Sequence, residues 1–282
     1  MSSGYTYGQV LYQAKKRLLH GGIDEAESDA WILFEECFSM SRSSYFMRQE
    51  EVAPKEKAEE YEGWITLRLQ HIPTQHLTGY QEFMGYRFMV NEHVLVPRQD
   101  TELLVEETLK QPGVRSVLDL CTGSGCIGIS LKLLNRNYEV TASDLSEAAL
   151  AVARQNAASL GANLLFIQSD LFEQVPGRYD MIVSNPPYIS VDEIQTLAPE
   201  VKEHDPYGAL CGGEDGLDFY RRIVKEAKSY LNQKGVLLME IGCRQAKDVS
   251  EMCEACGYTD IRVIKDYAGL DRVVSARMLI LK

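Results

Sequence analysis

Apolar residues in roughly the first 70 positions recur at helical spacing. One run ends at Gly21-Gly22, a second begins at Asp24, and a third begins at Pro54. A glycine pair stops a helix, whereas proline is favoured at a helix start because its missing N–H group is not needed there. The pattern therefore predicts three short amphipathic helices that form a small lobe.

The pattern changes to short extended runs near Tyr80. Residues 80–83 and 86–90 flank Met84-Gly85 and predict a β-hairpin around a glycine turn. Residues 94–97 continue extended, and Thr101 is predicted to cap the helix that follows. We expect this stretch to bridge the small lobe and a larger one.

Short apolar runs and helical segments alternate from Ser116 onward. The predicted strands are 116–120, 139–142, 164–167, 180–184, 236–241, 262–265 and 272–281, and the predicted helices are 127–134, 147–159, 217–230 and 245–256. This alternation predicts a mostly parallel sheet with helices on both faces, and the two consecutive final strands predict an antiparallel edge. The expected fold is α/β, a doubly wound, Rossmann-like, seven-stranded sheet preceded by a small helical domain. We expect that helical domain over residues 1–75, a hairpin linker over 76–98 and the sheet domain over 99–282.

Composition and charge narrow the class of protein. The 282 residues carry a net charge of −12, and no basic face is visible, which disfavours direct binding of nucleic acid. No signal peptide opens the chain, and no apolar run reaches the roughly 18 residues of a membrane span, so we expect a cytoplasmic protein without a membrane anchor. The seven cysteines are odd in number and irregular in spacing, which predicts neither disulfides nor a metal site.

A glycine-rich turn follows the first strand of the alternating region. Gly123-x-Gly125-x-x-Gly128 formally matches the dinucleotide fingerprint, in which glycines permit positive φ and close backbone approach. Taken alone, this match indicates no particular cofactor. It leaves an NAD-dependent oxidoreductase as one interpretation.

Three acidic residues at successive strand ends make the cofactor prediction more specific. Asp144 is placed to accept hydrogen bonds from ribose hydroxyls, and Asp170 suits the exocyclic amine of adenine beside an apolar wall at Leu171. Asp119, next to the glycine turn, would repel a diphosphate but attract a sulfonium or ammonium group. Each acid alone is typical of a helix cap. Together, at one sheet edge, they favour S-adenosylmethionine over NAD.

The tetrad Asn185-Pro186-Pro187-Tyr188 follows a buried strand and predicts the reaction. Asn-Pro and Pro-Pro are also ordinary turn sequences, but two residues without N–H groups leave carbonyl acceptors open. The Asn185 amide oxygen and the Pro186 carbonyl can each accept one hydrogen of a planar NH2 group, while Tyr188 lies flat on it. This arrangement predicts methyl transfer to a delocalised nitrogen by positioning and electrostatics, with no metal and no enzyme nucleophile.

Further segments, 77–83, 96–102 and 205–210, together with the tetrad resemble the bacterial release-factor glutamine methyltransferases, the HemK or PrmC family. The resemblance implies methylation of the glutamine side-chain nitrogen in the Gly-Gly-Gln motif of class 1 peptide chain release factors. It implies that residues 1–75 recognise this protein substrate, and we expect a monomer. The implied cofactor contacts are Cys121, Thr122, Gly123, Ser124, Gly125, Asp144, Asp170, Leu171 and Asn185, and the implied substrate contacts are Asn185, Pro186, Pro187 and Tyr188.

Three other interpretations stay open at this point. A nucleic-acid methyltransferase acting on adenine or guanine would use the same tetrad, an oxidoreductase would leave the tetrad unexplained, and a silent adaptor would bind cofactor without turnover. One departure from the family pattern is Cys121, which stands where glycine is more usual. The net charge of −12 is suited to steering a basic release factor toward the enzyme.

Overall fold

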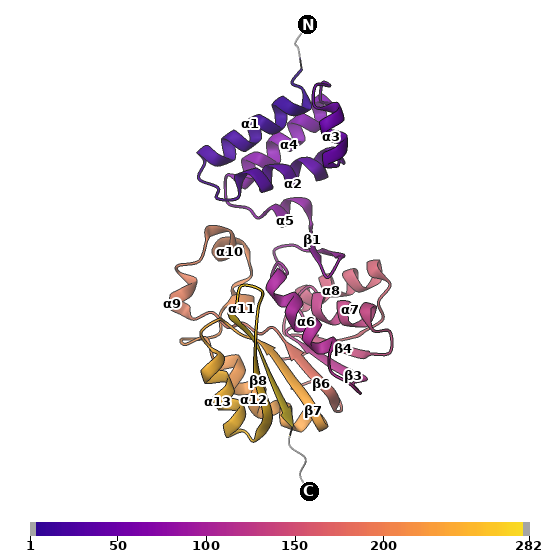
Figure 1. The fold of residues 1–282 in the computed structure, drawn as a ribbon, viewed down its shortest axis with the longest axis vertical. Helices are drawn as coiled ribbons and strands as arrows, with labels where there is room; N and C mark the ends of the chain where they lie inside the picture. Colours follow the sequence, from indigo (N-terminus) through magenta and orange to yellow (C-terminus); the bar gives the residue numbers. More distant parts are fainter. Residues whose placement is uncertain (1–3, 279–282) are drawn as a thin grey trace. The chain divides into compact units, whose positions relative to one another are not determined.

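The computed structural model describes residues 4–278, which fall into two compact units (Figure 1). Of the described residues, the first unit comprises 4–79 together with 199–204, and the second comprises 80–198 and 205–278. The chain therefore returns to the helical unit after it has entered the sheet unit.

The first unit is built from helices. Its elements are α1 (Tyr7–His20), α2 (Ala26–Phe38), α3 (Arg42–Arg48), α4 (Lys55–Arg68), α5 (Thr74–Thr78) and the short α10 (Pro199–His204). Thr6 caps α1 in a capping box with Gln9, which satisfies backbone donors at the helix start. Apolar faces of α1, α2 and α4 pack around Phe34 and Tyr61, and the Tyr61 hydroxyl donates to the Ala30 carbonyl at 2.7 Å.

A buried arginine joins three helices of this unit. The Arg68 guanidinium on α4 donates to Asp29 on α2 and to Glu200 on α10, each at 2.7 Å. Because Arg68 and Asp29 are buried, removing either would leave a charge without its partner away from water. The position of α10 in the helical unit depends on this contact.

The second unit combines a hairpin, a large sheet and flanking helices. Its strands are β1 (Tyr80–Phe83), β2 (Tyr86–Met89), β3 (Ser116–Leu120), β4 (Glu139–Asp144), β5 (Leu165–Gln168), β6 (Tyr179–Ser184), β7 (Leu231–Glu240), β8 (Tyr258–Lys265) and β9 (Asp271–Met278). Its helices are η1 (Gln99–Thr101), α6 (Glu102–Leu109), α7 (Cys126–Leu134), α8 (Glu147–Leu160), α9 (Val191–Ile194), α11 (Tyr207–Leu210), α12 (Asp218–Tyr230) and α13 (Ala246–Ala255). Met84 and Gly85 both have positive φ, which fits the tight turn of the hairpin.

The large sheet has seven strands in the order β5-β4-β3-β6-β7-β9-β8. The first five pair in parallel, whereas β9 is antiparallel to both β7 and β8. Alternate residues of each strand face opposite sides, so Leu118 and Ile182 pack with α12 and α13, while Val117 and Val183 pack with α6 and α7. The predicted doubly wound, seven-stranded sheet with its antiparallel edge is therefore confirmed for the described residues; predicted strand positions 279–281 lie outside them.

Some local predictions differ from the structure. Thr101 occupies the N-cap position of α6 as predicted, but it ends the 3-10 turn η1 in a helical conformation and its side chain makes no cap bond, so the predicted capping contact is wrong. Its hydroxyl accepts a hydrogen bond from Asn185 instead. The short helices α3, α5, α9, α10 and α11 were not predicted, because runs of four to seven residues carry too little periodicity to recognise.

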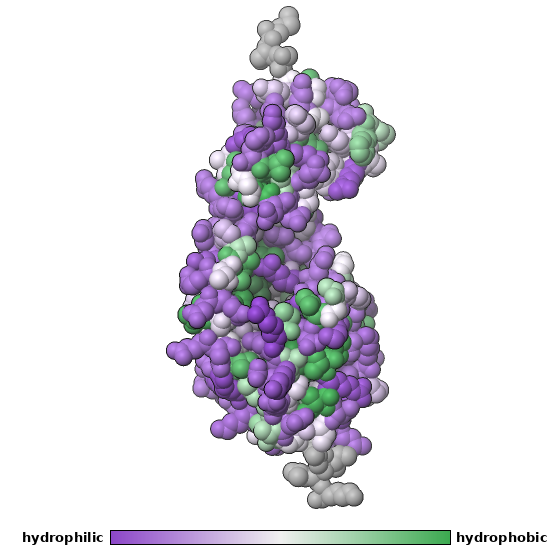
Figure 2. Space-filling view, turned by 60° about the vertical axis from the view of Figure 1, so that its left-hand side comes forward, coloured by the Kyte–Doolittle hydropathy of each residue, from purple (hydrophilic) through white to green (hydrophobic). Residues whose placement is uncertain are grey.

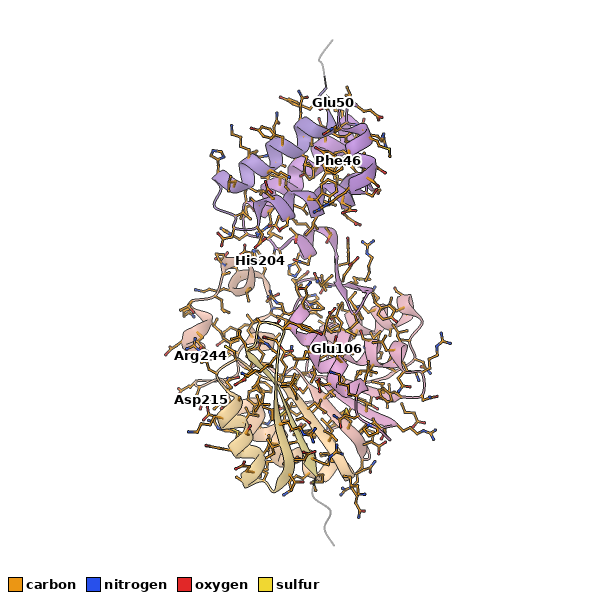
Figure 3. The ribbon with its side chains drawn as sticks, in the orientation of Figure 1. Phe46, Glu50, Glu106, His204, Asp215 and Arg244 are labelled. Carbon is orange, nitrogen blue, oxygen red and sulfur yellow. The ribbon has the colours of Figure 1, made fainter. Side chains whose placement is uncertain are left out.

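The surface shown in Figure 2 is mostly hydrophilic with small hydrophobic patches. Phe46 and Met47, on α3 of the helical unit, are 68% and 79% exposed, and Figure 3 labels Phe46 on that helix. Within residues 4–278, no helix has both the length and the apolar character that crossing a bilayer would require.

Candidate functional site

The candidate site lies at the carboxyl edge of the parallel strands. The chain runs from β3 outward to β4 and β5 and then returns to β6 on the other side of β3, so the topology reverses between β3 and β6. Open α/β sheets bind ligands at such a switch point. A cavity of about 420 Å³ lies there, lined by segments that follow β3, β4, β5 and β6, by residues 93–98 and by part of α12.

The glycine turn after β3 forms one wall of this cavity. Gly123 and Gly125 both have positive φ, and an added Cβ at Gly125 would come within 2.7 Å of Ile129. Gly123 lines the cavity, and an added Cβ there would meet no protein atom within 4 Å. The turn thus has a closed side against α7 and an open side, which fits close approach of a ligand to backbone.

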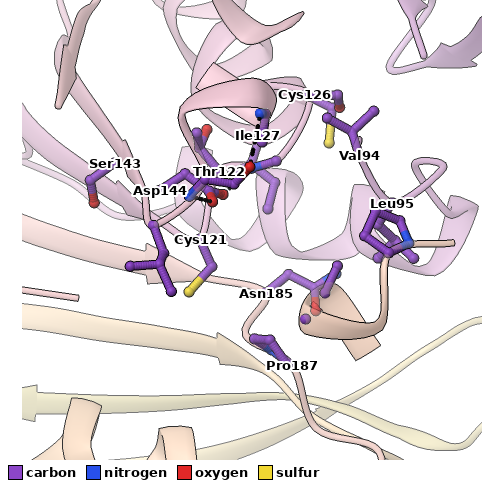
Figure 4. A pocket seen from close by; sticks show the side chains of 18 of the residues that line it. Val94, Leu95, Cys121, Thr122, Cys126, Ile127, Ser143, Asp144, Asn185 and Pro187 are labelled. Carbon is purple, nitrogen blue, oxygen red and sulfur yellow. Dashed lines mark hydrogen bonds between the residues drawn. The ribbon is translucent and has the colours of Figure 1, made fainter. Parts of the chain in front are cut away.

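Asp144 is oriented by backbone donors. Its Oδ2 accepts from the Gly123 N–H and its Oδ1 from the Ser146 N–H, both at 2.9 Å. Burial raises the pKa of this carboxyl, while the backbone hydrogen bonds oppose the rise. Figure 4 shows Asp144 beside the turn, and a carboxylate with about four lone-pair sites can still accept from a diol.

Asp119 lies beneath the turn and does not line the cavity described here. Its Oδ2 accepts from the Thr122 hydroxyl at 2.6 Å and from the Gly128 N–H at 2.9 Å. Burial raises its pKa to about 7, and these two hydrogen bonds oppose the rise. Through Oδ2 this carboxyl holds the turn in shape, whereas its Oδ1 is buried and has no hydrogen-bond partner among the described residues.

The corner after β5 places Asp170 and Leu171 in the cavity wall. Asp170 Oδ1 forms an ion pair with the guanidinium Nη1 of Arg222 on α12 at 2.9 Å. Both side chains are partly exposed. Leu171 is buried and adopts a positive φ, which turns the chain sharply at this corner. Arg222 was not a predicted site residue, because its position on a helix face gives no signal in the sequence.

The tetrad follows β6 directly, and only two of its four residues line the cavity. Asn185 and Pro187 line it, whereas Pro186 and Tyr188 lie outside its lining among the described residues. The Asn185 Nδ2 donates to Thr101 Oγ1 at 3.3 Å. Figure 4 shows Asn185 and Pro187 beside Cys121 of the neighbouring strand end.

Tyr188 is held from two sides. Its hydroxyl donates to Glu240 Oε1 of β7 at 3.4 Å, and its carbonyl accepts from Gln245 Nε2 at 2.9 Å. Burial raises the pKa of the Tyr188 hydroxyl, so it stays a donor near neutral pH. The main-chain path after the two prolines is thereby fixed to β7 and the start of α13.

The structure adds four residues to the site that the sequence did not indicate. Arg222 pairs with Asp170, Thr101 contacts Asn185, Glu240 contacts Tyr188, and Asn156 of α8 donates to the Ser124 carbonyl at 2.9 Å. None of the four belongs to a motif of the sequence that indicates a ligand site. Gly125, a predicted contact, closes the turn against α7 and does not line the cavity.

The residues that line the cavity fit an adenosyl sulfonium compound. The volume suits a small cofactor, the lining is mainly apolar, and the carboxylates of Asp144 and Asp170 supply polar acceptors. A diphosphate at the glycine turn would lie beside the Asp144 carboxylate, which would repel it. Within the described residues, no group of three or more His, Cys, Asp or Glu side chains is arranged to hold a metal ion.

Comparison with known proteins identifies two family domains. Residues 98–200 match the Methyltransferase small domain, and residues 9–79 match the PrmC N-terminal domain. The release factor glutamine methyltransferase of Cereibacter sphaeroides is 42% identical over 271 residues, which cover 95% of this chain and 97% of that protein. The release factor glutamine methyltransferase of Geobacter sulfurreducens is 37% identical over 276 residues, which cover 97% of each chain.

Solved structures share the fold of class I methyltransferases. A methyltransferase from Pyrococcus furiosus aligns with a TM-score of 0.55 at 20% identity, covering 70% of this chain and 91% of that chain. The hMettl16 catalytic domain, solved with an RNA hairpin, aligns with a TM-score of 0.56 at 14% identity, covering 81% and 83%. The 16S rRNA methyltransferase RsmC of T. thermophilus, in complex with AdoMet and guanosine, has a TM-score of 0.50 at 18% identity over 70% of this chain and 49% of that chain. At these identities the likeness extends to the fold alone.

Proposed function

Since this chain belongs to the family of release factor glutamine methyltransferases, we propose that it methylates the side-chain amide nitrogen of the glutamine in the Gly-Gly-Gln motif of class 1 release factors. The observation that carries this proposal is the placement of Asn185 and the glycine turn in one cavity. An amide acceptor and a cofactor-binding turn are thereby brought together at the switch point of the sheet.

We assign S-adenosylmethionine to this cavity as the methyl donor. When bound, it supplies an electrophilic methyl group on a sulfonium centre. The Asp144 carboxylate is placed to accept from ribose hydroxyls, and the Asp170–Leu171 corner to contact the adenine. The turn from Cys121 to Gly125 lies against the amino-acid part, and Asp119 keeps that turn in shape through Thr122 and Gly128.

The tetrad positions the nucleophile. Asn185 Oδ1 and the Pro186 carbonyl accept the two N–H groups of the glutamine amide, which fixes the nitrogen and increases its electron density. Pro187 adds a wall of the cavity, and the Tyr188 ring packs on the planar carboxamide. These residues orient and polarise an unreactive amide without general-base catalysis.

The helical unit is proposed to recognise the protein substrate. Its match to the PrmC N-terminal domain supports this role, and so does its separation from the cavity-bearing unit as a compact body with its own core. We assign this role to residues 1–75, with residues 76–98 as the connection to the catalytic domain over 99–282. We expect the enzyme to act as a monomer in the cytoplasm.

The test is mass spectrometry of a purified class 1 release factor after incubation with the protein and S-adenosylmethionine. The Gly-Gly-Gln peptide should gain the mass of one methylene unit, with fragmentation placing the gain on the glutamine. A release factor carrying asparagine at that position serves as the matched control and should stay unmodified.

Transfer of labelled methyl to RNA or DNA, with the release factor unmodified, would overturn the proposal in favour of a nucleic-acid methyltransferase. Calorimetric binding of NADH in preference to S-adenosylmethionine would overturn the cofactor assignment. Binding of S-adenosylmethionine without any transfer would indicate a silent adaptor.

A further inference from the structure

The side chain of Gln245, immediately before α13, connects the tetrad to two neighbouring loops. Its Nε2 donates to the Tyr188 carbonyl at 2.9 Å and to the Gly216 carbonyl at 3.2 Å. Its Oε1 accepts from the Gly242 N–H at 2.9 Å and from the Tyr220 hydroxyl at 3.4 Å. Both hydrogens of the NH2 group and both lone pairs of the oxygen therefore have a partner within the sheet unit.

The backbone partners of Gln245 fix the direction of its amide. A carbonyl can only accept and an N–H can only donate, so the NH2 group must face Tyr188 and Gly216 while the oxygen faces Gly242. A reversed amide would place oxygen against two carbonyl oxygens and NH2 against an N–H group. The position therefore requires a side chain with two donors on one side and an acceptor on the other, which an amide supplies.

Two glycines leave the space that this amide occupies. An added Cβ at Gly216 would come within 2.9 Å of Gln245 Nε2, and one at Gly242 would come within 2.9 Å of Gln245 Oε1. Gly216 also has a φ of 74°, which favours glycine. The backbone on both sides of the Gln245 amide is thus shaped to approach it closely.

The Tyr188 carbonyl is where the tetrad is tied at its far end. At its near end, Ser184 pairs with Leu120 of β3 and Met239 of β7, and its hydroxyl donates to the Leu120 carbonyl at 2.9 Å. Between these two points lie Asn185 and two prolines, which have a restricted φ and no N–H group. The direction of the intervening carbonyls therefore depends on where the two ends of the segment are held.

We propose that Gln245 is a positioning residue for methyl transfer, which holds the Tyr188 end of the tetrad so that the Pro186 carbonyl and the Tyr188 ring meet the substrate carboxamide correctly. This inference rests on the proposed function, in which these two groups contact the glutamine amide. Among the described residues Gln245 does not belong to the cavity lining. It acts through the main chain, without touching cofactor or substrate.

The first experiment removes the connection with Gln245→Ala. We expect kcat for release-factor methylation to fall by about tenfold or more, because a small displacement of groups that orient the substrate slows a reaction strongly. The dissociation constant of S-adenosylmethionine in calorimetry should stay within about twofold, since the glycine turn and Asp144 keep their contacts. Gln233→Ala, at an exposed position of β7, is the matched control and should change neither quantity.

A kcat of Gln245→Ala within about twofold of wild type would overturn the inference. A parallel loss of kcat, cofactor affinity and melting temperature would overturn it as well, because this result would show a general structural role. All assays are run below the melting temperature of every variant.

The second experiment, Gln245→Glu, makes the donor depend on pH. An ionised carboxylate cannot donate to the Tyr188 carbonyl, whereas a protonated carboxyl can donate to it and still accept from Gly242. The kcat of this variant, divided by that of wild type at each pH, should therefore rise as the pH is lowered from about 8.5 to about 5.5. A ratio that stays constant or falls would overturn the inference.

The pH profile reports the new carboxyl because groups common to both proteins cancel in the ratio. Tyr220 is the titratable side chain that hydrogen-bonds to Gln245 within the described residues, and burial raises its pKa well above its ordinary value. The Tyr220 hydroxyl thus stays protonated throughout this range. Gln245→Ala should give a constant ratio, and so should Gln233→Glu, which adds the same charge at an exposed position of β7.

A readout without turnover separates this inference from the proposed function. Tyr188-Ile189 is the one Tyr-Ile pair in the sequence, so labelling tyrosine carbonyls with carbon-13 and isoleucine with nitrogen-15 yields a single peptide signal in triple-resonance NMR. This signal reports the carbonyl that accepts from Gln245. Its carbon shift should change in Gln245→Ala, and in Gln245→Glu it should return toward the wild-type value as the pH is lowered.

An identical carbonyl shift in wild type and Gln245→Ala would overturn the inference while leaving the proposed function intact. A wild-type protein that leaves the release factor unmodified would refute the proposed function, whatever the carbonyl shift. The two failures are therefore distinguishable.

Discussion

Cys121 adopts a backbone conformation that side chains other than glycine rarely take. Its φ is 58°, in the left-handed region, and its thiol lines the cavity. A non-glycine residue there costs roughly 1–2 kcal/mol, and a β-branched side chain is less tolerant still. The local strain is a direct result of cysteine standing where glycine is more usual.

Substitution at Cys121 should show this strain. We expect Cys121→Gly to unfold in urea at a free energy within about 1 kcal/mol of wild type or above it, since relief of strain offsets the added freedom of the unfolded chain. Cys121→Val should lose about 1–2 kcal/mol or more. A valine variant as stable as the glycine variant would contradict the reasoning.

Asn185 should affect turnover much more than cofactor binding. Removing one preorganised polar contact costs roughly 2–4 kcal/mol of activation free energy, so Asn185→Ala should lower kcat by about 30-fold to 1000-fold. Calorimetry with S-adenosylmethionine should show affinity changed far less, because the turn and Asp144 remain. Steady-state kinetics with a release factor measures kcat, and unchanged turnover would refute the role of the tetrad.

The identity of the site residues and the strand ends that carry them were predictable from the sequence, whereas the direction of each side chain was not. The sequence placed Asp144, Asp170 and Asn185 at one sheet edge, and the structure brings all three to one cavity. The sequence predicts Asp119 beside the cofactor; in the structure it lies outside the cavity lining, and its Oδ2 is bonded to Thr122 and Gly128. Those bonds depend on rotamers and on helix position, which strand periodicity does not encode.

Asn156 connects three elements around the glycine turn. From α8 its amide exchanges two hydrogen bonds with the Met89 backbone of β2, at 2.7 and 3.0 Å, and donates a third to the Ser124 carbonyl. It is 1% exposed, so water cannot replace these contacts. The hairpin and the cofactor turn therefore share one side chain.

Truncating the Asn156 side chain should disturb both the hairpin and the glycine turn. We expect Asn156→Ala to lower the free energy of unfolding by about 2–4 kcal/mol, because buried backbone groups lose their partners. S-adenosylmethionine should bind more weakly in calorimetry, because Ser124 belongs to the turn. The exposed Asn137→Ala is the control and should change neither quantity; equal effects in both variants would contradict this account.

At the element scale, long periodic segments were predictable and irregular ones were not. The strands from Ser116 to Ser184 and the main helices between them follow the apolar pattern. β7 begins at Leu231 rather than near Val236, because a bulge in its pairing with β6 interrupts the pattern around Lys234, which has a positive φ. Thr101 was interpreted as a cap because threonine before an apolar helix usually is one, yet its partner is 84 residues away along the chain.

The stability of the whole molecule should depend on pH through two buried acids. Burial raises the pKa of Asp119 from 3.8 and of Glu240 from 4.5, each to about 7, so the folded state binds more protons than the unfolded state between these values. The stabilisation is complete below the unfolded pKa values and is lost as pH rises through 7. Each group contributes a slope of at most about 1.4 kcal/mol per pH unit.

Urea unfolding across the neutral range measures this slope. Wild type should become less stable from weakly acidic to weakly alkaline pH, and Asp119→Asn and Glu240→Gln should each flatten the dependence. A wild-type stability that rises with pH over this interval would show that other groups dominate. Exposed Glu139→Gln should keep the wild-type slope.

The net charge of the whole molecule predicts a salt effect on substrate encounter. A charge of −12 attracts a basic release factor at long range, and salt screens such forces over about 10 Å at 0.1 M. KM for the release factor should therefore rise between about 0.05 and 0.3 M salt, while kcat at saturation stays nearly constant. Steady-state kinetics at several salt concentrations tests this; a KM independent of salt would exclude electrostatic steering.

The return of α10 to the helical unit makes that unit discontinuous in sequence. Glu200 completes the partners of Arg68, yet it is encoded more than a hundred residues downstream of α4. A ribosome finishes the first five helices long before it makes this partner. A fragment ending at residue 79 would leave Arg68 with Asp29 alone, so the helical unit reaches its full set of ion pairs only after most of the sheet has been synthesised.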